Sequence, residues 1–203
     1  MGTDIHGFFQ KYEPNLNLWV DVAPEYDEKR DYYLFSILDN MRNSNDFSYI
    51  DLPRGLPKEV YLNEENMYKT HSLNLWNSRI QIETSYPEDN YEIWLGDHSY
   101  SWLSDHEMIE WNSSPKISWL DGLILYSEYS KWNKKSDPNF DYSQYKPSTT
   151  IVTEEEYLKG KIGDCVKVNW QQDIREYLAY FFNEVIRLKK LHGKIRFVFG
   201  FDN

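Results

Sequence analysis

The C-terminal stretch "QQDIREYLAYFFNEVIRLKKLHGKIRFVFGFDN", residues 171–203, decides the predicted fold. Its first part carries apolar residues at helical spacing, which predicts a helix over 171–191. Asn169 can cap the start of this helix, and Gly193 can end it. The rest, 194–202, is rich in Phe and β-branched residues and predicts a final strand. A helix that leads into a last strand often returns the chain to the first strand of its sheet.

The other end of the chain begins "MGTDIHGFFQKY", which predicts a strand over 4–12. Turn residues follow, and a second strand is expected over 16–22, which together make a hairpin. Side chains of a strand alternate between its two faces, so Asp4 and His6 share one face. If the first strand pairs antiparallel with the last, we expect Asp4, His6 and Asp202 to gather at one end of the sheet.

Three shorter helices are expected between the two ends. The segment "DYYLFSILDNMRN", 31–43, has helical spacing and begins with an aspartate that can cap it. In "SWLSDHEMIEW", 101–111, Ser104 and Glu107 stand three residues apart and form a capping box. The segment 57–68 begins with a proline, which is tolerated in a first helical turn, and is the third expected helix.

The remaining segments contribute less regular structure. Short strands are expected near 79–83 and 91–95, and the many Ser, Asn, Tyr and Pro residues over about 128–150 predict a long irregular excursion. The predicted fold class is therefore α+β. One domain over 1–203 would hold a mainly antiparallel sheet that includes the N- and C-terminal strands, packed by the long C-terminal helix and by the shorter ones.

Composition narrows the function classes. Aromatic residues make up 17% of the 203 residues, which argues against disorder. The net charge of −11 argues against a broad nucleic-acid groove, although a local basic pocket stays open. Cys165 is the single cysteine, so an intrachain disulfide framework and a Cys-rich zinc site are excluded. No apolar run approaches a membrane span and no signal-peptide pattern is present, so we expect no membrane partner and a cytoplasmic protein.

No established catalytic motif occurs in the sequence, whether a Walker A loop, His-Glu-x-x-His or Gly-x-Ser-x-Gly. Among the five histidines, His106 and His192 occupy expected helix positions and are interpreted as structural. His98 stands beside Ser99 in "GDHSYSW" and, with His6, is a candidate functional residue. An acid beside an imidazole can bind a metal, hold a proton or simply pair, and the sequence leaves these alternatives open.

Five segments occur in an order that resembles a known family: "MGTDIHGFF", "RDYYLFSILDNMRN", "PRGLPKEV", "DHSYSWLSDHEM" and "IRFVFGFDN". They are similar to small proteins carried largely by phages and prophages, which typically begin Met-Gly-Cys-Asp-Ile-His and contain Arg-Gly-Leu-Pro and His-Ser-x-Ser-Trp motifs. The family's usual Cys is Thr3 here, which argues against a mechanism that needs a thiol at this place. The resemblance implies a viral context, hence a host bacterial cytoplasm, and a set of positions rather than a reaction.

The positions that the resemblance indicates include arginines, histidines, hydroxyls and aromatic rings. If they converge, they make a pocket for a phosphorylated or carboxylated ligand with a flat ring, because Arg forks bind phosphate and aromatic rings stack on bases. The predicted ligand-binding residues are Asp4, His6, Arg30, Tyr32, Arg54, Gly55, His98, Ser99, Ser101, Trp102 and Asp202, and the motif also includes Asp31. Alternatively, Arg30 and Arg54 pair with Asp4, Asp31 or Asp51 and only tie loops to the sheet.

The favoured function is a phage-type accessory protein that binds a small anionic, nucleotide-like ligand and sequesters a host immune signalling molecule, thereby inhibiting anti-phage defence. One alternative is an inhibitor that binds a host defence protein directly, through an aromatic surface. Another is a metal-dependent hydrolase in which Asp4, His6, His98 and Asp202 hold a divalent metal. No catalytic residue is assigned, no cofactor is required, and the ligand, the host target and the oligomeric state are left open.

Overall fold

The structure is a computed structural model, and it describes residues 2–22, 30–62, 67–69, 73–74, 79–80 and 92–202. Contacts divide the chain into two compact units. Met1–Ser114 with Tyr177–Asn203 form the first, called here the terminal unit, and Pro115–Glu176 form the second, called the inserted unit. The expectation of one domain over the whole chain stays a prediction, and each unit is described by itself.

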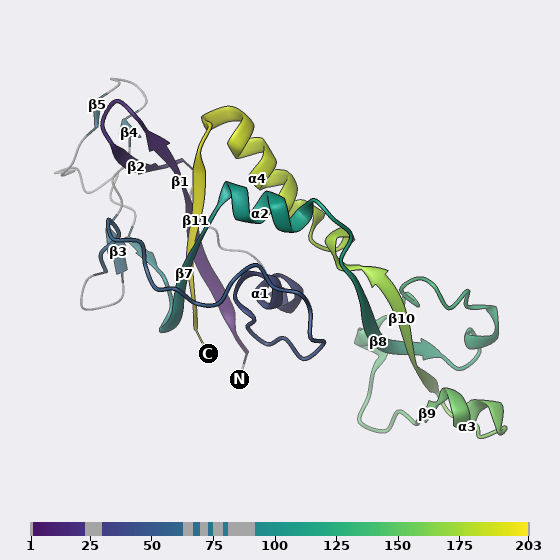
Figure 1. Ribbon diagram of the computed structural model, residues 1–203. Coiled ribbons are helices and arrows are strands. Elements are labelled where there is room, and N and C mark those ends of the chain that lie inside the picture. Colours follow the sequence, from purple (N-terminus) through teal and green to yellow (C-terminus); the bar gives the residue numbers. More distant parts are fainter. Residues whose placement is uncertain are drawn as a thin grey trace. The chain divides into compact units, whose positions relative to one another are not determined.

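The terminal unit is built on a four-stranded antiparallel sheet in the order β2-β1-β11-β7 (Figure 1). The strands are β1 (Asp4–Glu13), β2 (Leu18–Asp21), β7 (His98–Ser104) and β11 (Ile195–Asp202). Asp4 lies opposite Asp202, and the register continues to Lys11 opposite Ile195. The prediction that the first and last strands are antiparallel neighbours is confirmed, and so is the α+β class.

Helices α1 (Tyr32–Asp39), α2 (Asp105–Asn112) and α4 (Ala179–His192) complete the terminal unit, and α2 and α4 lie side by side in Figure 1. Their expected caps are present. The Asp31 carboxylate accepts hydrogen bonds from the first backbone amides of α1. Ser104 and Glu107 form a complete capping box at the start of α2. These caps satisfy amide groups that a helix start leaves without an intrahelical partner.

One face of the terminal sheet is covered by the helices and is called here the helix face. Along β11, Phe197, Phe199 and Phe201 point to this face, and all three are buried. The ring of Phe181 from α4 lies 5.5 Å from that of Phe197 and 6.1 Å from that of Phe9 on β1. The apolar stripe of α4 therefore packs on the sheet, as the sequence predicts.

The opposite face of the sheet, called here the second face, carries a separate apolar cluster. Phe8 and Val198, which lie opposite each other on β1 and β11, pack with Val60 and Leu95. Because β-strand side chains alternate, the even-numbered residues of β1, including Asp4 and His6, all belong to this face. The predicted site residues at the strand ends therefore share the face that the helices leave uncovered.

The start of the C-terminal helix differs from the prediction. Strand β10 (Cys165–Asp173) and a short 3-10 turn (Ile174–Glu176) occupy the expected first turns, and α4 begins at Ala179. The predicted start at 171 and the Asn169 cap are wrong, because Val166, Val168 and Trp170 are buried at a period of two rather than at helical spacing. The predicted end is confirmed, since Gly193 follows the helix with a φ of 82°.

The helix expected over 57–68 does not form in the described part of that segment. Only one turn is present, closed by a hydrogen bond from the Val60 amide to the Pro57 carbonyl at 2.9 Å. Strand β3 (Met67–Lys69) then pairs with β6 (Glu92–Trp94). Val60 and Leu62 both pack in the cluster on the second face, whereas residues two apart would lie on opposite sides of a helix.

The short strands expected near 79–83 and 91–95 are present in part. Strand β4 (Leu73–Asn74) pairs with β5 (Arg79–Ile80), and β6 (Glu92–Trp94) lies within the second predicted range. Residues 81–83 and 91 lie outside the described residues. The second strand of the N-terminal hairpin is shorter than predicted, because a turn occupies 14–17.

The inserted unit contains a three-stranded sheet in the order β8-β10-β9, with β8 (Ile117–Leu125) antiparallel to β10 and β9 (Ile151–Thr153) parallel to it. Helix α3 (Glu154–Leu158) follows β9. The irregular excursion expected at 128–150 connects β8 to β9 and contains only two short 3-10 turns, Tyr129–Lys131 and Tyr142–Gln144.

Phe181→Ala is expected to lower the free energy of unfolding by about 3–5 kcal/mol, because it removes a buried ring between α4 and the sheet. Ile186→Ala is the matched control, since Ile186 lies on the same helix with 47% of its surface exposed. The control should shift stability by less than about 0.5 kcal/mol. Urea denaturation measures both values, and similar losses in the two variants would contradict the packing described for Phe181.

Candidate functional site

The ends of β1 and β11 bring four of the predicted site residues together. Arg30 donates two hydrogen bonds to the Asp4 carboxylate, at 2.8 and 2.6 Å. The Asp4 amide donates to the Asp202 carboxylate at 3.0 Å, and the His6 Nε2 atom lies 3.7 Å from the other Asp202 oxygen. The hydrogen bond from Arg30 holds the pKa of Asp4 below its ordinary value. Tyr32, also predicted, begins α1 two residues after Arg30.

The Pro53–Pro57 segment runs along the free edge of β7 and positions a second group. The Gly55 amide donates to the Tyr100 carbonyl at 2.9 Å, and the Arg54 amide donates to the Ser101 hydroxyl at 3.4 Å. Gly55 has a φ of 77°, which favours glycine. The Arg54 guanidinium then lies 4.7 Å from the centre of the Trp102 ring. Arg54, Gly55, Ser101 and Trp102 are therefore neighbours.

Both predicted arginines have carboxylate partners. One guanidinium nitrogen of Arg54 lies 2.9 Å from Asp51 and 2.8 Å from Glu107, and Arg30 is held by Asp4. These pairs match the alternative in which arginines tie loops to the sheet. An anionic ligand at either arginine would have to compete with a carboxylate that is already bound.

His98 and Ser99 form a third group, apart from His6. The His98 Nδ1 atom lies 2.9 Å from the Ser99 hydroxyl, and the His98 ring stacks on Phe201 with ring centres 6.5 Å apart. His98 is the β7 partner of Phe201, whereas His6 is the β1 partner of Gly200. Adjacent residues of β11 face opposite sides, so the sheet separates the two histidines. His6 and His98 therefore do not share one pocket, contrary to the expectation.

The same separation applies to the expected metal ligands. His98 lies on the helix face, while Asp4, His6 and Asp202 lie at the end of the second face. Across the described ranges, no group of three or more His, Cys, Asp and Glu side chains could hold a metal ion. The Asp-x-His of β1 is instead a strand end in which Arg30 binds Asp4 and the His6 ring lies near Asp202.

The second face carries a larger constellation that the sequence analysis missed. Cations and aromatic rings alternate across the strands, and we call this set the cation–aromatic row: Tyr12, Trp19, Arg54, Trp102, Lys194 and Arg196. The Arg196 guanidinium lies 4.2 Å from the Trp19 ring centre and 6.0 Å from that of Trp102. The Lys194 ammonium lies 5.1 Å from the Tyr12 ring centre and 5.3 Å from that of Trp19.

Arg196 is the fixed centre of this row. Only 3% of its surface is exposed, and its Nε atom donates to the Gln10 side chain at 2.9 Å. Its carboxylate partner, Glu59, lies 3.2 Å away and has an exposed side chain. Lys194 is exposed, and the described residues place no carboxylate within ion-pair distance of it. Of the three cations in the row, Arg196 is therefore buried and Lys194 is accessible, and both lie beside the indole ring of Trp19.

Strand alternation alone could have indicated part of the row. Tyr12 lies on the same face of β1 as Asp4 and His6, and Arg196 lies on the same face of β11 as Asp202. Trp19 pairs with Tyr12 across the hairpin. Bringing Trp102 to Arg196 depends on β7 pairing with β11, which no local pattern in the sequence predicts.

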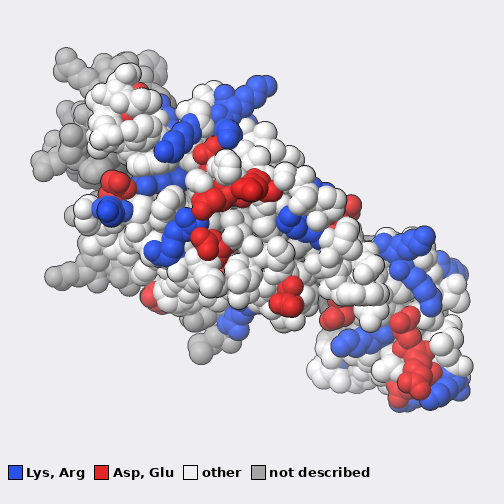
Figure 2. Space-filling view, viewed as in Figure 1, with Lys and Arg blue, Asp and Glu red and all other residues white. Residues whose placement is uncertain are grey.

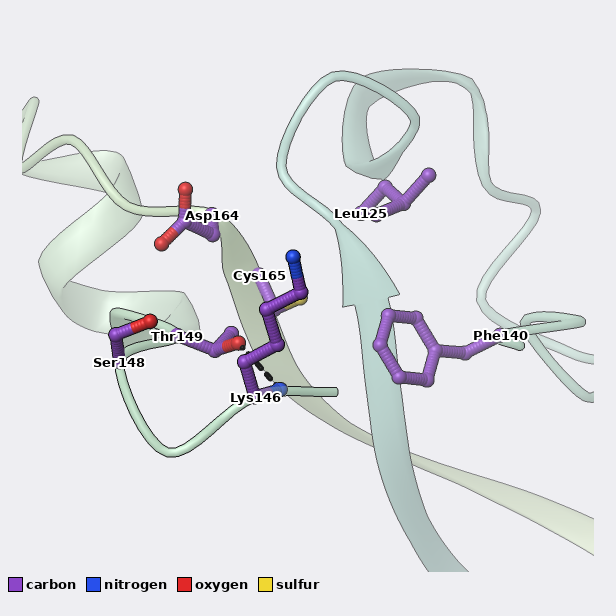
Figure 3. A pocket seen from close by; sticks show the side chains of 7 residues that line it. All are labelled: Leu125, Phe140, Lys146, Ser148, Thr149, Asp164 and Cys165. Carbon is purple, nitrogen blue, oxygen red and sulfur yellow. Dashed lines mark hydrogen bonds between the residues drawn. The ribbon is translucent and has the colours of Figure 1, made fainter. Parts of the chain in front are cut away.

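The inserted unit has a separate pocket of about 260 Å³ (Figure 3). It is lined by Leu125, Phe140, Lys146, Ser148, Thr149, Asp164 and Cys165. The Lys146 amide donates to the Thr149 hydroxyl at 3.0 Å, and Cys165 is buried at the start of β10. Burial, and to a lesser degree Asp164, raises the pKa of the Cys165 thiol, which disfavours the reactive thiolate form.

Charge on the face shown in Figure 2 is mixed. Figure 2 shows Lys and Arg side chains interspersed with Asp and Glu on the face in view, rather than gathered into one broad basic surface.

Within the described ranges, no helix combines the length and the apolar character that crossing a membrane requires. No protein-family model, curated protein or solved structure matches this chain.

Arg196→Met is expected to lower the free energy of unfolding by about 1–3 kcal/mol, because Gln10 loses its donor and Trp19 loses a cation in a buried setting. Lys194→Met removes the exposed cation of the same row and should cost less than about 1 kcal/mol. Chemical denaturation compares the two variants. Equal losses would show that burial does not distinguish the two positions.

Proposed function

We propose that the terminal unit binds a small anionic ligand that carries a flat ring, of nucleotide-like chemistry, on the cation–aromatic row. The observation that carries this proposal is the alternation of three cations with three aromatic rings on one sheet face of an acidic protein. Aromatic faces stack on a base, and a neighbouring ammonium or guanidinium binds its phosphate.

The Lys194 end of the row is its accessible part. Lys194 is exposed over the rings of Tyr12 and Trp19, and it can donate to a phosphate without first breaking an ion pair with a described residue. Buried Arg196 adds positive potential beneath, and its partner Glu59 is 56% exposed, so that this carboxylate can turn toward water when an anion arrives. A ligand that stacks on Trp19 thereby meets a locally favourable charge.

A binding role also agrees with the sequence evidence. The resemblance to phage-borne proteins and the absence of an established catalytic motif support sequestration of a nucleotide-like signal used in host defence. Under this proposal the protein lowers the free concentration of the signal rather than converting it. Mass spectrometry of the small molecules that denaturation releases from protein purified out of phage-infected cells tests this part, and recovery of a stoichiometric nucleotide is the expected result.

Three probes separate the ring from the anion: AMP has both, adenosine lacks the phosphate, and ribose 5-phosphate lacks the base. We expect calorimetry to detect AMP binding, with the other two at least about tenfold weaker, because each loses one part worth 1–3 kcal/mol. Absence of binding by all three at millimolar concentration would contradict the proposal.

Trp19→Leu and Lys194→Met are each expected to weaken AMP binding by about tenfold or more, since they remove the stacking surface and the accessible cation. Trp119→Leu and Lys190→Met are matched controls, because both side chains are exposed and lie outside the row. The controls should keep the wild-type affinity. If all four variants bind AMP equally, the ligand lies elsewhere, and the pocket of Figure 3 is the next region to mutate.

A further inference from the structure

Asp39 is a buried acid that the proposed ligand site does not use. It is the last residue of α1, and only 3% of its surface is exposed. Among the residues that the structure describes, neither of its carboxylate oxygens has a hydrogen-bond partner. A buried carboxylate without donors is costly in free energy, whereas the neutral acid is tolerated far better.

The surroundings add to this cost. A helix carries partial negative charge at its C-terminal end, which is where Asp39 stands. The charged groups that act on it are Asp51, which repels a carboxylate, and Arg54, which attracts one. Arg54 is already bound by Asp51 and Glu107, so its attraction is shared among three acids. Burial, followed by repulsion from Asp51, raises the pKa of Asp39 to about 7 despite Arg54.

The segment 40–57 that follows α1 folds back onto the helix end. The Ile50 amide donates to the Ile37 carbonyl at 2.7 Å, and the Trp111 indole nitrogen of α2 donates to the Ser48 carbonyl at 3.0 Å. Asp51 and Arg54, the two charged groups that act on Asp39, both belong to this segment. The segment therefore lies close to the Asp39 end of α1.

We propose that Asp39 is a proton-controlled latch for the segment 40–57: the protonated acid stays buried with the segment closed, and the carboxylate is driven toward water and loosens it. The inference is independent of the proposed ligand. It assigns a pH-sensitive element to the segment that carries Arg54.

The direction of the pH dependence follows from the two states. The unfolded chain releases the Asp39 proton near pH 4, whereas the folded chain holds it until about pH 7. Between these values the folded state binds the extra proton, so stability falls as pH rises through this window and levels off above it. An ordinary ion-paired aspartate would show the opposite slope.

The test compares the full-length protein with Asp39→Asn, which keeps the shape of the acid without its titration. From pH 5 to pH 8 we expect the wild-type melting temperature to fall by about 5 °C or more, and exchange of the Ile50 amide, corrected for intrinsic rate, to speed by about tenfold or more. The Asn variant should lose both dependences. Asp46→Asn, an exposed change in the same segment, should keep the wild-type profile.

Two results would overturn the latch: a wild-type protein whose Ile50 protection is unchanged across this range, or an Asn variant with the same pH profile as wild type. If the Asn variant fails to fold, the carboxyl ¹³C shift of Asp39 in the wild-type protein decides. A midpoint near pH 7 is expected, and a midpoint below pH 5 would refute the proposal.

Discussion

The antiparallel pairing of β1 with β11 is the constraint on which the terminal unit depends. It joins residues almost two hundred positions apart, from Asp4 opposite Asp202 to Lys11 opposite Ile195. Gly7 permits the close approach of β11, and Gly200 permits the close approach of Leu95 to β11. A Cβ on Gly200 would collide with the Leu95 carbonyl, and a Cβ on Gly7 would lie 2.7 Å from the Val198 carbonyl oxygen. Both positions therefore require a residue without a side chain.

The register of this pairing also decides which side chains of β11 lie on the helix face and which lie on the second face. The odd-numbered Phe residues of β11 meet the helices, and the even-numbered positions carry Val198, Arg196 and the strand-end Asp202. A slip by one residue would exchange the two sets, exposing three phenylalanines and burying charge against α4. Packing of the helix face thus fixes Arg196 on the second face, where its guanidinium lies over the rings of Trp19 and Trp102.

Acidic side chains have an internal role in this protein. Asp4, Glu107 and Glu59 each hold an arginine. These contacts tie Arg30 to β1, the Pro53–Pro57 segment to α2, and Glu59 to β11. This explains why arginines that the sequence suggested for ligand binding are occupied. Asp39 is the exception, because no described residue donates a hydrogen bond to its buried carboxyl group, and its neighbour Arg54 is already bound by Asp51.

The sequence alone determined the features that depend on local periodicity and on chain ends: the two terminal strands, the caps at Asp31 and Ser104, and the helix stop at Gly193. It also indicated that Asp4, His6 and Asp202 meet, because the strands at both ends are recognisable and one pairing suffices. The sequence-based prediction failed at the boundary between β10 and α4, where a strand pattern of period two runs directly into a helical pattern. Only the tertiary structure decided that His98 lies across the sheet from His6 and that Trp102 reaches Arg196. The physical reason is that strand order and register are set by packing between distant segments, and no local pattern encodes which strand becomes the neighbour of β11.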